Sequence, residues 1–334
     1  MDTRHSLLEL AAQQGLSPQQ TRQLLAGAQL AAEPVHLATW LPRGIAVLAA
    51  ALGGMGVVMW IAANWEAWGR VGHFTLLQGL VLATGMGAAL RAGGRAPLGL
   101  LALLGIGALF AYFGQTYQTG ADPWQLFALW AVLALPLCWG ARSDVLWAPW
   151  TLVAMTAIAL WTHTYSGHRW SVEPDLLRVH LLAWTATLLL AGALSPALNR
   201  FTGAGPWGFR TAVTLAVVAI ATTALGGLFH SSVLPHFYLG LLVLLVAGAL
   251  LCTPRSFDVF AVSAAALGVN ALLVCGLVRW MGEGAWGGDW LGRLTLIGLF
   301  AAGLLAASVS GILKLGRRYT PHYTAPTKAT GDAA

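Results

Sequence analysis

The chain alternates between long apolar runs and short polar segments from residue 41 almost to its C-terminus. Ten of the runs have about the length that a helix needs to cross a hydrocarbon core of about 30 Å. They cover residues 44–63, 71–90, 96–114, 124–141, 145–165, 176–194, 211–229, 237–252, 257–280 and 290–313. The run 237–252 is short, and the pattern leaves open whether it crosses fully, tilts or is partly re-entrant. The pattern predicts an all-α, polytopic integral membrane helix bundle with about ten transmembrane helices.

The polar ends of the chain predict two further regions around the bundle at 41–313. Residues 1–40 have the pattern of a short helical hairpin, in which Gly15 ends one helix and Ser17 and Pro18 begin the next. Serine is a favoured N-cap, and proline suits the first helical position. Residues 314–334 end in a segment rich in Thr, Pro and Ala, which predicts a disordered tail.

Composition agrees with a membrane protein. Hydrophobic residues make up 57% of the chain and charged residues 9%, whereas a soluble protein has about 25% charged residues. The mean hydropathy is +0.70. The lipid bilayer is therefore the expected partner of most of the surface. A net charge of +6 would suggest nucleic acid for a soluble chain, but here topology explains it and we expect no nucleic acid partner.

The distribution of Lys and Arg predicts the orientation. An even number of spans places both termini on one side, and thirteen of the 18 basic residues then fall on that side, against five on the other. By the positive-inside rule both termini are cytoplasmic. We therefore expect a multi-pass protein of the bacterial inner membrane, and the other side faces the periplasm.

The predicted outward segments are rich in acids, histidines and tryptophans. A belt of interfacial aromatic rings explains most of the tryptophans, but it does not call for acids and histidines among them. The densest segment is 113–124, where Asp122, Pro123 and Trp124 have the pattern of a helix start, so that capping is favoured for Asp122 over catalysis. No such local role explains the amide and phenol groups of Gln115, Tyr117 and Gln118.

A second outward segment, 64–68, closes the first span. Tryptophan at positions 65 and 68 suits an interface anchor. Glu66 is less easily explained, because the dipole at a helix C-terminus disfavours an anion. The candidate ligand- or partner-binding residues are therefore Gln115, Tyr117, Gln118, Asp122, Asn64, Glu66, Trp68 and Trp124.

Three stretches resemble the bacterial predicted membrane proteins catalogued as domain of unknown function 2157. They are Gly15–Leu25, Ile61–Glu66 and Gly114–Trp130, the last with the sequence Gly-Gln-Thr-Tyr-Gln-Thr-Gly-Ala-Asp-Pro-Trp at its start. The resemblance covers about the first 150 residues. It implies a membrane protein, draws attention to segments 64–68 and 114–124, and implies a possible membrane-protein partner. It brings no activity with it.

No catalytic motif, metal-ligand spacing or cofactor fingerprint occurs, so the catalytic residues are unknown and we expect no metal and no cofactor. Within the spans, Asn270 and Gln78 are the clearest polar residues, and we expect both to face the bundle, more as interhelical contacts than as substrate ligands. No span carries a central charge, which argues against an ion-coupled transporter.

The function predicted first is non-enzymatic: an outward-facing polar and aromatic pocket that binds a small ligand, a lipid headgroup or a membrane partner on the periplasmic side. Two alternatives stay open. One is a membrane-embedded enzyme, such as a transferase acting on envelope lipid or glycan, which requires a carboxylate and a histidine within hydrogen-bonding reach. The other is an uncoupled facilitator or permease.

Overall fold

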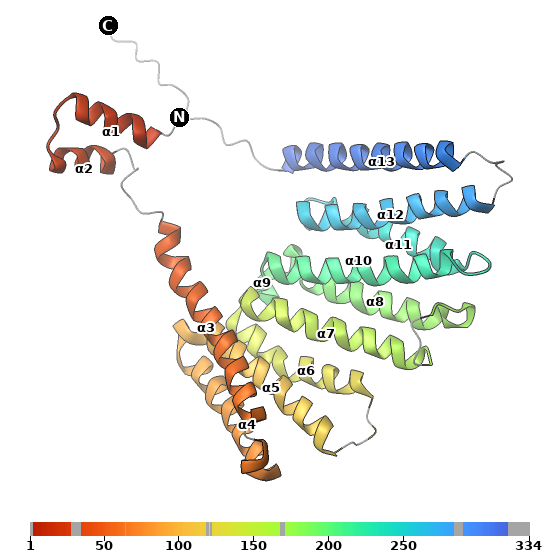
Figure 1. The fold of residues 1–334 in the computed structure, drawn as a ribbon, viewed down its shortest axis with the longest axis horizontal. Helices are drawn as coiled ribbons and strands as arrows, with labels where there is room; N and C mark the ends of the chain where they lie inside the picture. Colours follow the sequence, from red (N-terminus) through yellow and green to blue (C-terminus); the bar gives the residue numbers. More distant parts are fainter. Residues whose placement is uncertain are drawn as a thin grey trace, which may run out of the picture. The chain divides into compact units, whose positions relative to one another are not determined.

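The computed structural model describes residues 3–27, 35–63, 65–117, 120, 122–167, 171–283 and 290–319. These residues form thirteen α-helices and three short 3-10 helices, with no strand among them (Figure 1). The fold is therefore all-α, as the sequence predicts. The chain divides into two units, residues 1–63 and 64–334, which we describe separately.

The first unit contains α1 (Thr3–Gln13), α2 (Pro18–Gly27) and α3 (Val35–Ala63). Helices α1 and α2 pack against each other. Ser17 caps α2 as predicted: the backbone N–H of Gln20 donates to Ser17 Oγ at 3.3 Å, and Gln20 Oε1 accepts from the N–H of Ser17 at 2.9 Å. This reciprocal pair is a capping box, which satisfies two backbone donors at the helix start.

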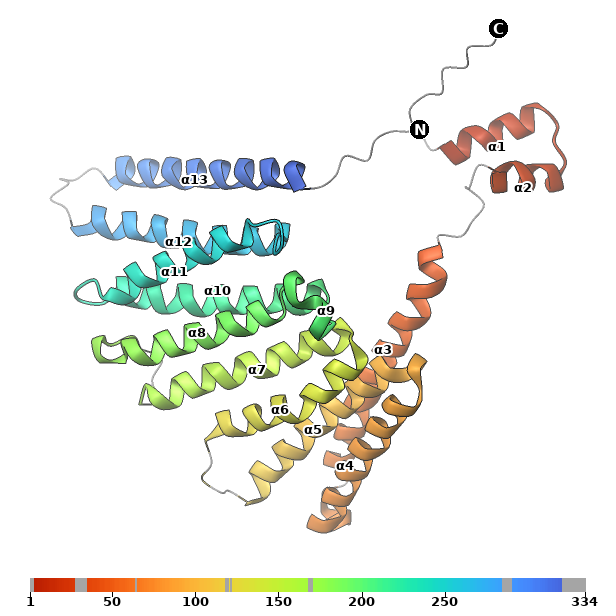
Figure 2. The same cartoon turned by 180° about the vertical axis from the view of Figure 1, so that it is seen from behind.

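The second unit is a series of helices that run back and forth beside one another (Figures 1 and 2). They are α4 (Trp65–Leu90), α5 (Arg95–Tyr117), α6 (Pro123–Ala141), α7 (Asp144–Tyr165), α8 (Leu177–Ala193), α9 (Asn199–Thr202), α10 (Pro206–Leu228), α11 (Pro235–Leu251), α12 (Val259–Glu283) and α13 (Trp290–Tyr319). We call the end where α5, α7, α10 and α12 finish the outer end, after the predicted orientation. The opposite end is the inner end.

Eight of these helices are long and apolar enough to cross a membrane. Two other apolar stretches, Gly44–Val57 in α3 and Pro235–Leu251 in α11, are shorter. All ten predicted apolar runs form helices, and eight of these helices have membrane-spanning length. Helix α4 differs in detail: its helical backbone is interrupted at Gly69, whose φ of 63° and ψ of 176° are accessible essentially to glycine alone, so that its membrane-length part starts there.

Helix α10 occupies the centre of the second unit, because it packs against α7, α8, α11 and α12. Two apolar cores meet along it. Phe209, Ala212 and Ala216 belong to the core shared with α5, α6 and α7, whereas Ile220 and Ala224 belong to the core shared with α8, α11 and α12. Movement of α10 would therefore disturb both cores at once.

Charged side chains tie the inner end together. The Asp144 carboxylate accepts three backbone N–H groups at the start of α10, from Gly205 at 2.8 Å, Trp207 at 2.8 Å and Gly208 at 3.2 Å. Asp258 accepts from the N–H of Ala261 at 3.0 Å in the first turn of α12 and forms a 2.9 Å ion pair with Arg210. Asp258 is the N-cap of α12, and Asp144 takes the place of a side-chain cap at the start of α10, where the helix dipole favours an anion.

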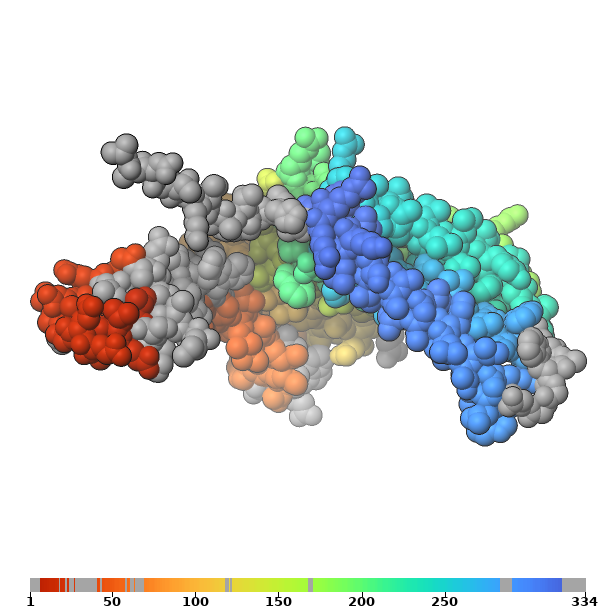
Figure 3. Space-filling model, turned by 90° about the horizontal axis from the view of Figure 1, so that it is seen from above, coloured from red at the N-terminus to blue at the C-terminus, as the bar shows by residue number. Residues whose placement is uncertain are grey.

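Helix α13 lies at one edge of the second unit and packs against α12 (Figure 3). None of its described residues is buried. Asn270 of α12 and Ser308 of α13 form a reciprocal pair, in which Asn270 Nδ2 donates to Ser308 Oγ at 3.0 Å and Ser308 Oγ donates to Asn270 Oδ1 at 3.3 Å. The predicted interhelical role of Asn270 is confirmed. Gln78, which we expected to face the bundle, is instead exposed, because the buried face of α4 is the one that carries His73 and Leu77.

Candidate functional site

The main cavity at the outer end lies between α7, α8 and α10. Its volume is about 720 Å³, and its walls are largely apolar, with Met155, Ala183, Val218 and Ala219 among the lining residues. Pockets that bind small molecules typically have volumes of about 300–1,000 Å³ and apolar walls with few polar groups. This cavity has both properties.

An acid and a histidine stand together at the polar end of this cavity. Glu173 precedes α8 and His230 follows α10, and both line the cavity. Glu173 Oε2 lies 3.5 Å from His230 Nε2, and the side chains are 44% and 27% exposed. The carboxylate and the imidazole therefore meet each other at the mouth while both remain accessible.

The threonine hydroxyl groups of the cavity use their hydrogens within their own helices. Thr156, Thr162, Thr187, Thr222 and Thr223 each donate from Oγ1 to a backbone carbonyl three or four residues earlier, at 2.7–2.9 Å. Each oxygen keeps lone pairs with which it can accept a hydrogen bond. The threonines of the cavity wall therefore offer acceptors to a ligand, beside the other polar lining residues Ser171, His180 and His230.

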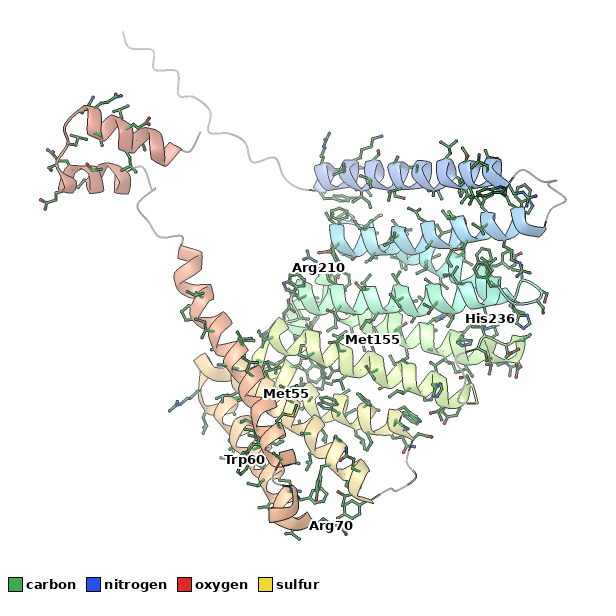
Figure 4. The ribbon with its side chains drawn as sticks, viewed as in Figure 1. Met55, Trp60, Arg70, Met155, Arg210 and His236 are labelled. Carbon is green, nitrogen blue, oxygen red and sulfur yellow. The ribbon has the colours of Figure 1, made fainter. Side chains whose placement is uncertain are left out.

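A pair of buried histidines lies beside the cavity. His180 of α8 lines it, and His180 Nδ1 is 3.1 Å from Nε2 of His236 at the start of α11. The two residues are 3% and 0% exposed. A contact between two imidazole nitrogens at this distance requires one to donate and the other to accept. Figure 4 places His236 at the end of α11 beside the α10–α11 loop, and Arg210 at the other end of α10.

Arg279 of α12 holds the loop that carries His230. Its Nη1 donates to the carbonyls of Leu228 at 2.8 Å and His230 at 2.6 Å, and its Nη2 donates to the carbonyl of Ser231 at 3.2 Å. These carbonyls lie at and just beyond the C-terminus of α10, where the helix dipole favours a cation. Arg279 therefore fixes the backbone on which His230 sits.

Of the residues predicted from the sequence, Gln115 and Tyr117 lie near a second, smaller hollow. Gln115 lines a space of about 310 Å³ together with Arg70, His73, Tyr112 and Thr116. Tyr117 is 47% exposed, and the Arg70 guanidinium carbon lies 5.7 Å from its ring centre. Arg70 is at the outer end of α4 in Figure 4. Gln115 thus lines the same hollow as an aromatic residue, Tyr112, and a cationic one, Arg70.

Asp122 and Trp124 lie at the start of α6. Asp122 has the predicted N-cap position, followed by Pro123, but its side chain makes no capping hydrogen bond. The predicted N-cap position of Asp122 is confirmed, and its backbone carbonyl accepts from the N–H of Gln125 at 3.0 Å, whereas its side chain does not cap. Trp124 lines an apolar hollow of about 350 Å³ with Trp161 of α7.

Asn64 and Gln118 lie outside the described residues, and the side chains of Glu66 and Trp68 on α4 lie outside them too.

The sequence did not single out His180, and it left Glu173 and His230 among the acids and histidines of the predicted outward segments. A single histidine in an apolar run is more often a core residue than part of a site, so His180 gave no distinct signal. The acid–histidine pair joins residues before α8 and after α10, and its formation depends on the packing of these helices.

A bundle of long apolar helices defines this chain as a multi-pass integral membrane protein. Residues 8–147 match the model of a family described as predicted membrane protein (DUF2157), which confirms the resemblance seen in the sequence motifs. No curated protein matches the chain, and no solved structure does. The matched part contains Gln115 and its hollow, whereas the lining of the 720 Å³ cavity begins at Leu152, beyond it.

Proposed function

We propose that this membrane protein binds a small amphipathic ligand in the cavity between α7, α8 and α10. The single observation that supports this is the shape and chemistry of the cavity: about 720 Å³ of largely apolar space that ends at Glu173 and His230. A ligand with an apolar chain and a polar end matches that distribution. The apolar chain would lie along the helices, and the polar end would meet the acid–histidine pair.

The proposed topology puts the mouth of the cavity on the periplasmic side of the bacterial inner membrane. It comprises ten spans, including the two shorter apolar stretches, with the hairpin, the tail and both termini in the cytoplasm. The excess of Lys and Arg on the terminus side supports it. The ligand would then enter from the outer leaflet or from the periplasm.

The smaller hollow is proposed as a contact for a lipid headgroup or a membrane partner. Gln115 and Tyr117 are its first candidates, next to Arg70, whose position over the Tyr117 ring supports a cation–π contact. Asp122, Trp124, Asn64, Glu66, Trp68 and Gln118 remain further candidates for the same role.

Native mass spectrometry of the protein purified in mild detergent tests the ligand-binding proposal. Ala219→Phe places a ring in the cavity, and Leu189→Phe adds the same ring to α8 at a residue that is 69% exposed and is not part of the cavity lining. We expect an amphiphile to co-purify with the wild type and with Leu189→Phe but to be lost from Ala219→Phe. Equal occupancy in all three would contradict the proposal.

A second candidate function, that of a membrane-embedded enzyme, is favoured by one observation. Glu173 and His230 are 3.5 Å apart, within the range in which a carboxylate can orient an imidazole for acid–base chemistry. The test incubates the reconstituted protein with envelope lipids and looks for new lipid species by mass spectrometry. Products formed by the wild type and absent with Glu173→Gln are expected for an enzyme. An unchanged lipid profile would contradict the enzyme function, and ligand binding would be the one proposed function that remains.

A further inference from the structure

The polar groups of the large cavity are unequal in kind, and this bears on the ligand. Glu173 is the carboxylate on its lining, and no Lys or Arg belongs to the lining among the described residues. Arg178 is two residues before His180 on α8, about 200° round the helix from the face that His180 and Trp184 turn to the cavity. Arg279 donates to backbone carbonyls instead.

The hydroxyl groups of the threonines and of Ser166 also have their hydrogens already bonded. The hydroxyl hydrogens of the five lining threonines bond to their own helices, and Ser166 Oγ donates to the carbonyl of His163 at 2.9 Å. The indole N–H of Trp184 donates to Thr223 Oγ1 at 2.9 Å. The threonine oxygens and the Glu173 carboxylate therefore offer acceptors to a ligand, and the carboxylate is the negatively charged group among them. The Ser171 hydroxyl and the imidazoles of His180 and His230 are the other polar groups of the lining.

From this balance, and resting on the proposed ligand-binding function, we infer that the cavity selects an amphiphile whose polar end donates hydrogen bonds. A primary amine fits best, because it brings three donors and a positive charge to Glu173. An alcohol fits next, with one donor and no charge. A carboxylate fits worst, because it is an acceptor only and is repelled by Glu173.

Photolabelling in phosphatidylcholine nanodiscs at pH 8 tests this selection. Two probes with the same twelve-carbon chain and the same diazirine are compared, one a primary amine and the other a carboxylate, and the labelled residues are mapped by mass spectrometry. Specific labelling is the part lost in Ala219→Phe and retained in Leu189→Phe. We expect specific labelling of α7, α8 and α10 by the amine at about tenfold lower concentration than by the carboxylate, the ratio that one charged hydrogen bond of about 1.4 kcal/mol gives.

Competition by unlabelled dodecylamine and dodecanol separates charge from hydrogen bonding. Glu173→Gln is expected to remove the advantage of dodecylamine over dodecanol. Asp175→Asn is the matched control, since Asp175 is an exposed carboxylate two residues away that is not part of the cavity lining. Arg169→Gln is included because Arg169 lies outside the described residues and is close in sequence to the mouth; the preference is expected to persist in it.

The outcomes distinguish the two proposals. Specific labelling by the carboxylate at a concentration equal to or below that of the amine overturns the selection while ligand binding stands. The same holds if Glu173→Gln leaves the dodecylamine advantage intact. Absence of specific labelling with either probe overturns the ligand-binding proposal itself.

Discussion

The two ends of the helix bundle use their carboxylates differently. At the inner end, Asp144 accepts three backbone N–H groups, and Asp258 caps α12 while it pairs with Arg210. At the outer end, Glu173 is 44% exposed beside a large cavity, and its described partner is His230 at 3.5 Å. Carboxylates with several hydrogen bonds hold helices in place, whereas an accessible carboxylate at a cavity is free to meet a ligand. The comparison predicts that mutations at the inner end reduce stability and that mutations at the outer end reduce binding.

The largest effect on stability is expected for Asp144→Ala. It leaves three N–H groups at the start of α10 without their acceptor, and the loss of several hydrogen bonds to a charged group costs about 3 kcal/mol in unfolding free energy. Thermal unfolding in detergent measures it. Asp144→Asn, which keeps one oxygen, should lose less. If Asp144→Ala unfolds at the wild-type temperature, the inner carboxylate does not have the structural role assigned to it.

A smaller loss of stability, about 2 kcal/mol, is expected for Arg279→Met, which removes the donors to the carbonyls after α10. This variant is an exception to the expected difference between the two ends, because Arg279 lies at the outer end and yet stabilises the fold. Arg279 also fixes the backbone that carries His230 at the cavity, so specific labelling by the amine probe should fall in Arg279→Met as well. Arg279→Lys keeps the charge and should recover part of both. If Arg279→Met loses stability but is labelled normally, the position of the loop after α10 does not matter for ligand binding.

The reciprocal pair between α12 and α13 is expected to contribute about 0.6 kcal/mol, as is typical of interhelical hydrogen bonds in membranes. Asn270→Ala, Ser308→Ala and the double variant form a cycle that isolates this coupling from the individual losses. Unfolding in detergent, followed by fluorescence, measures the three changes. Strictly additive losses would show that the two side chains do not stabilise each other.

The smallest effect on stability is expected for Glu173→Gln, below about 0.5 kcal/mol, because its contact with His230 is accessible to solvent and screened. Among the variants that stay folded, however, Glu173→Gln should cause the largest loss of amine binding. The comparison of its unfolding temperature with its labelling is the sharpest test of the expected difference between the two ends. A large loss of stability would place Glu173 with the inner carboxylates.

Much of the fold could be predicted from the sequence because the length and hydropathy of a membrane helix are local properties. The ten apolar runs, the Ser17 cap and the start of α6 at Pro123 follow from neighbouring residues. The sequence also shows that Asn270 needs a partner. It does not show that this partner is Ser308, because that depends on how α12 and α13 face each other.

The candidate site was harder to predict, because it also depends on which helix faces meet. His180 and His236 are 56 residues apart and come together only where α8 and α11 approach each other. The pair of Glu173 and His230 likewise requires the packing of α8 against α10. Apolar surfaces in a bilayer pack by shape, and hydropathy does not encode which faces meet. The 114–124 segment was conspicuous because its polarity is local, and two of its described residues, Gln115 and Thr116, line the smaller hollow.

The capping of α10 has a consequence for how the protein is made. This helix receives its N-terminal anion from Asp144 and its C-terminal cation from Arg279, and both come from other helices. The anion is already synthesised when α10 leaves the ribosome, but Arg279 follows Leu228 by 51 residues. At 5–20 residues per second this is a delay of roughly 3–10 s. During that interval the nascent chain contains α10 with an unsatisfied outer end, so the mouth of the cavity is completed late in biogenesis, after α12 has entered the membrane.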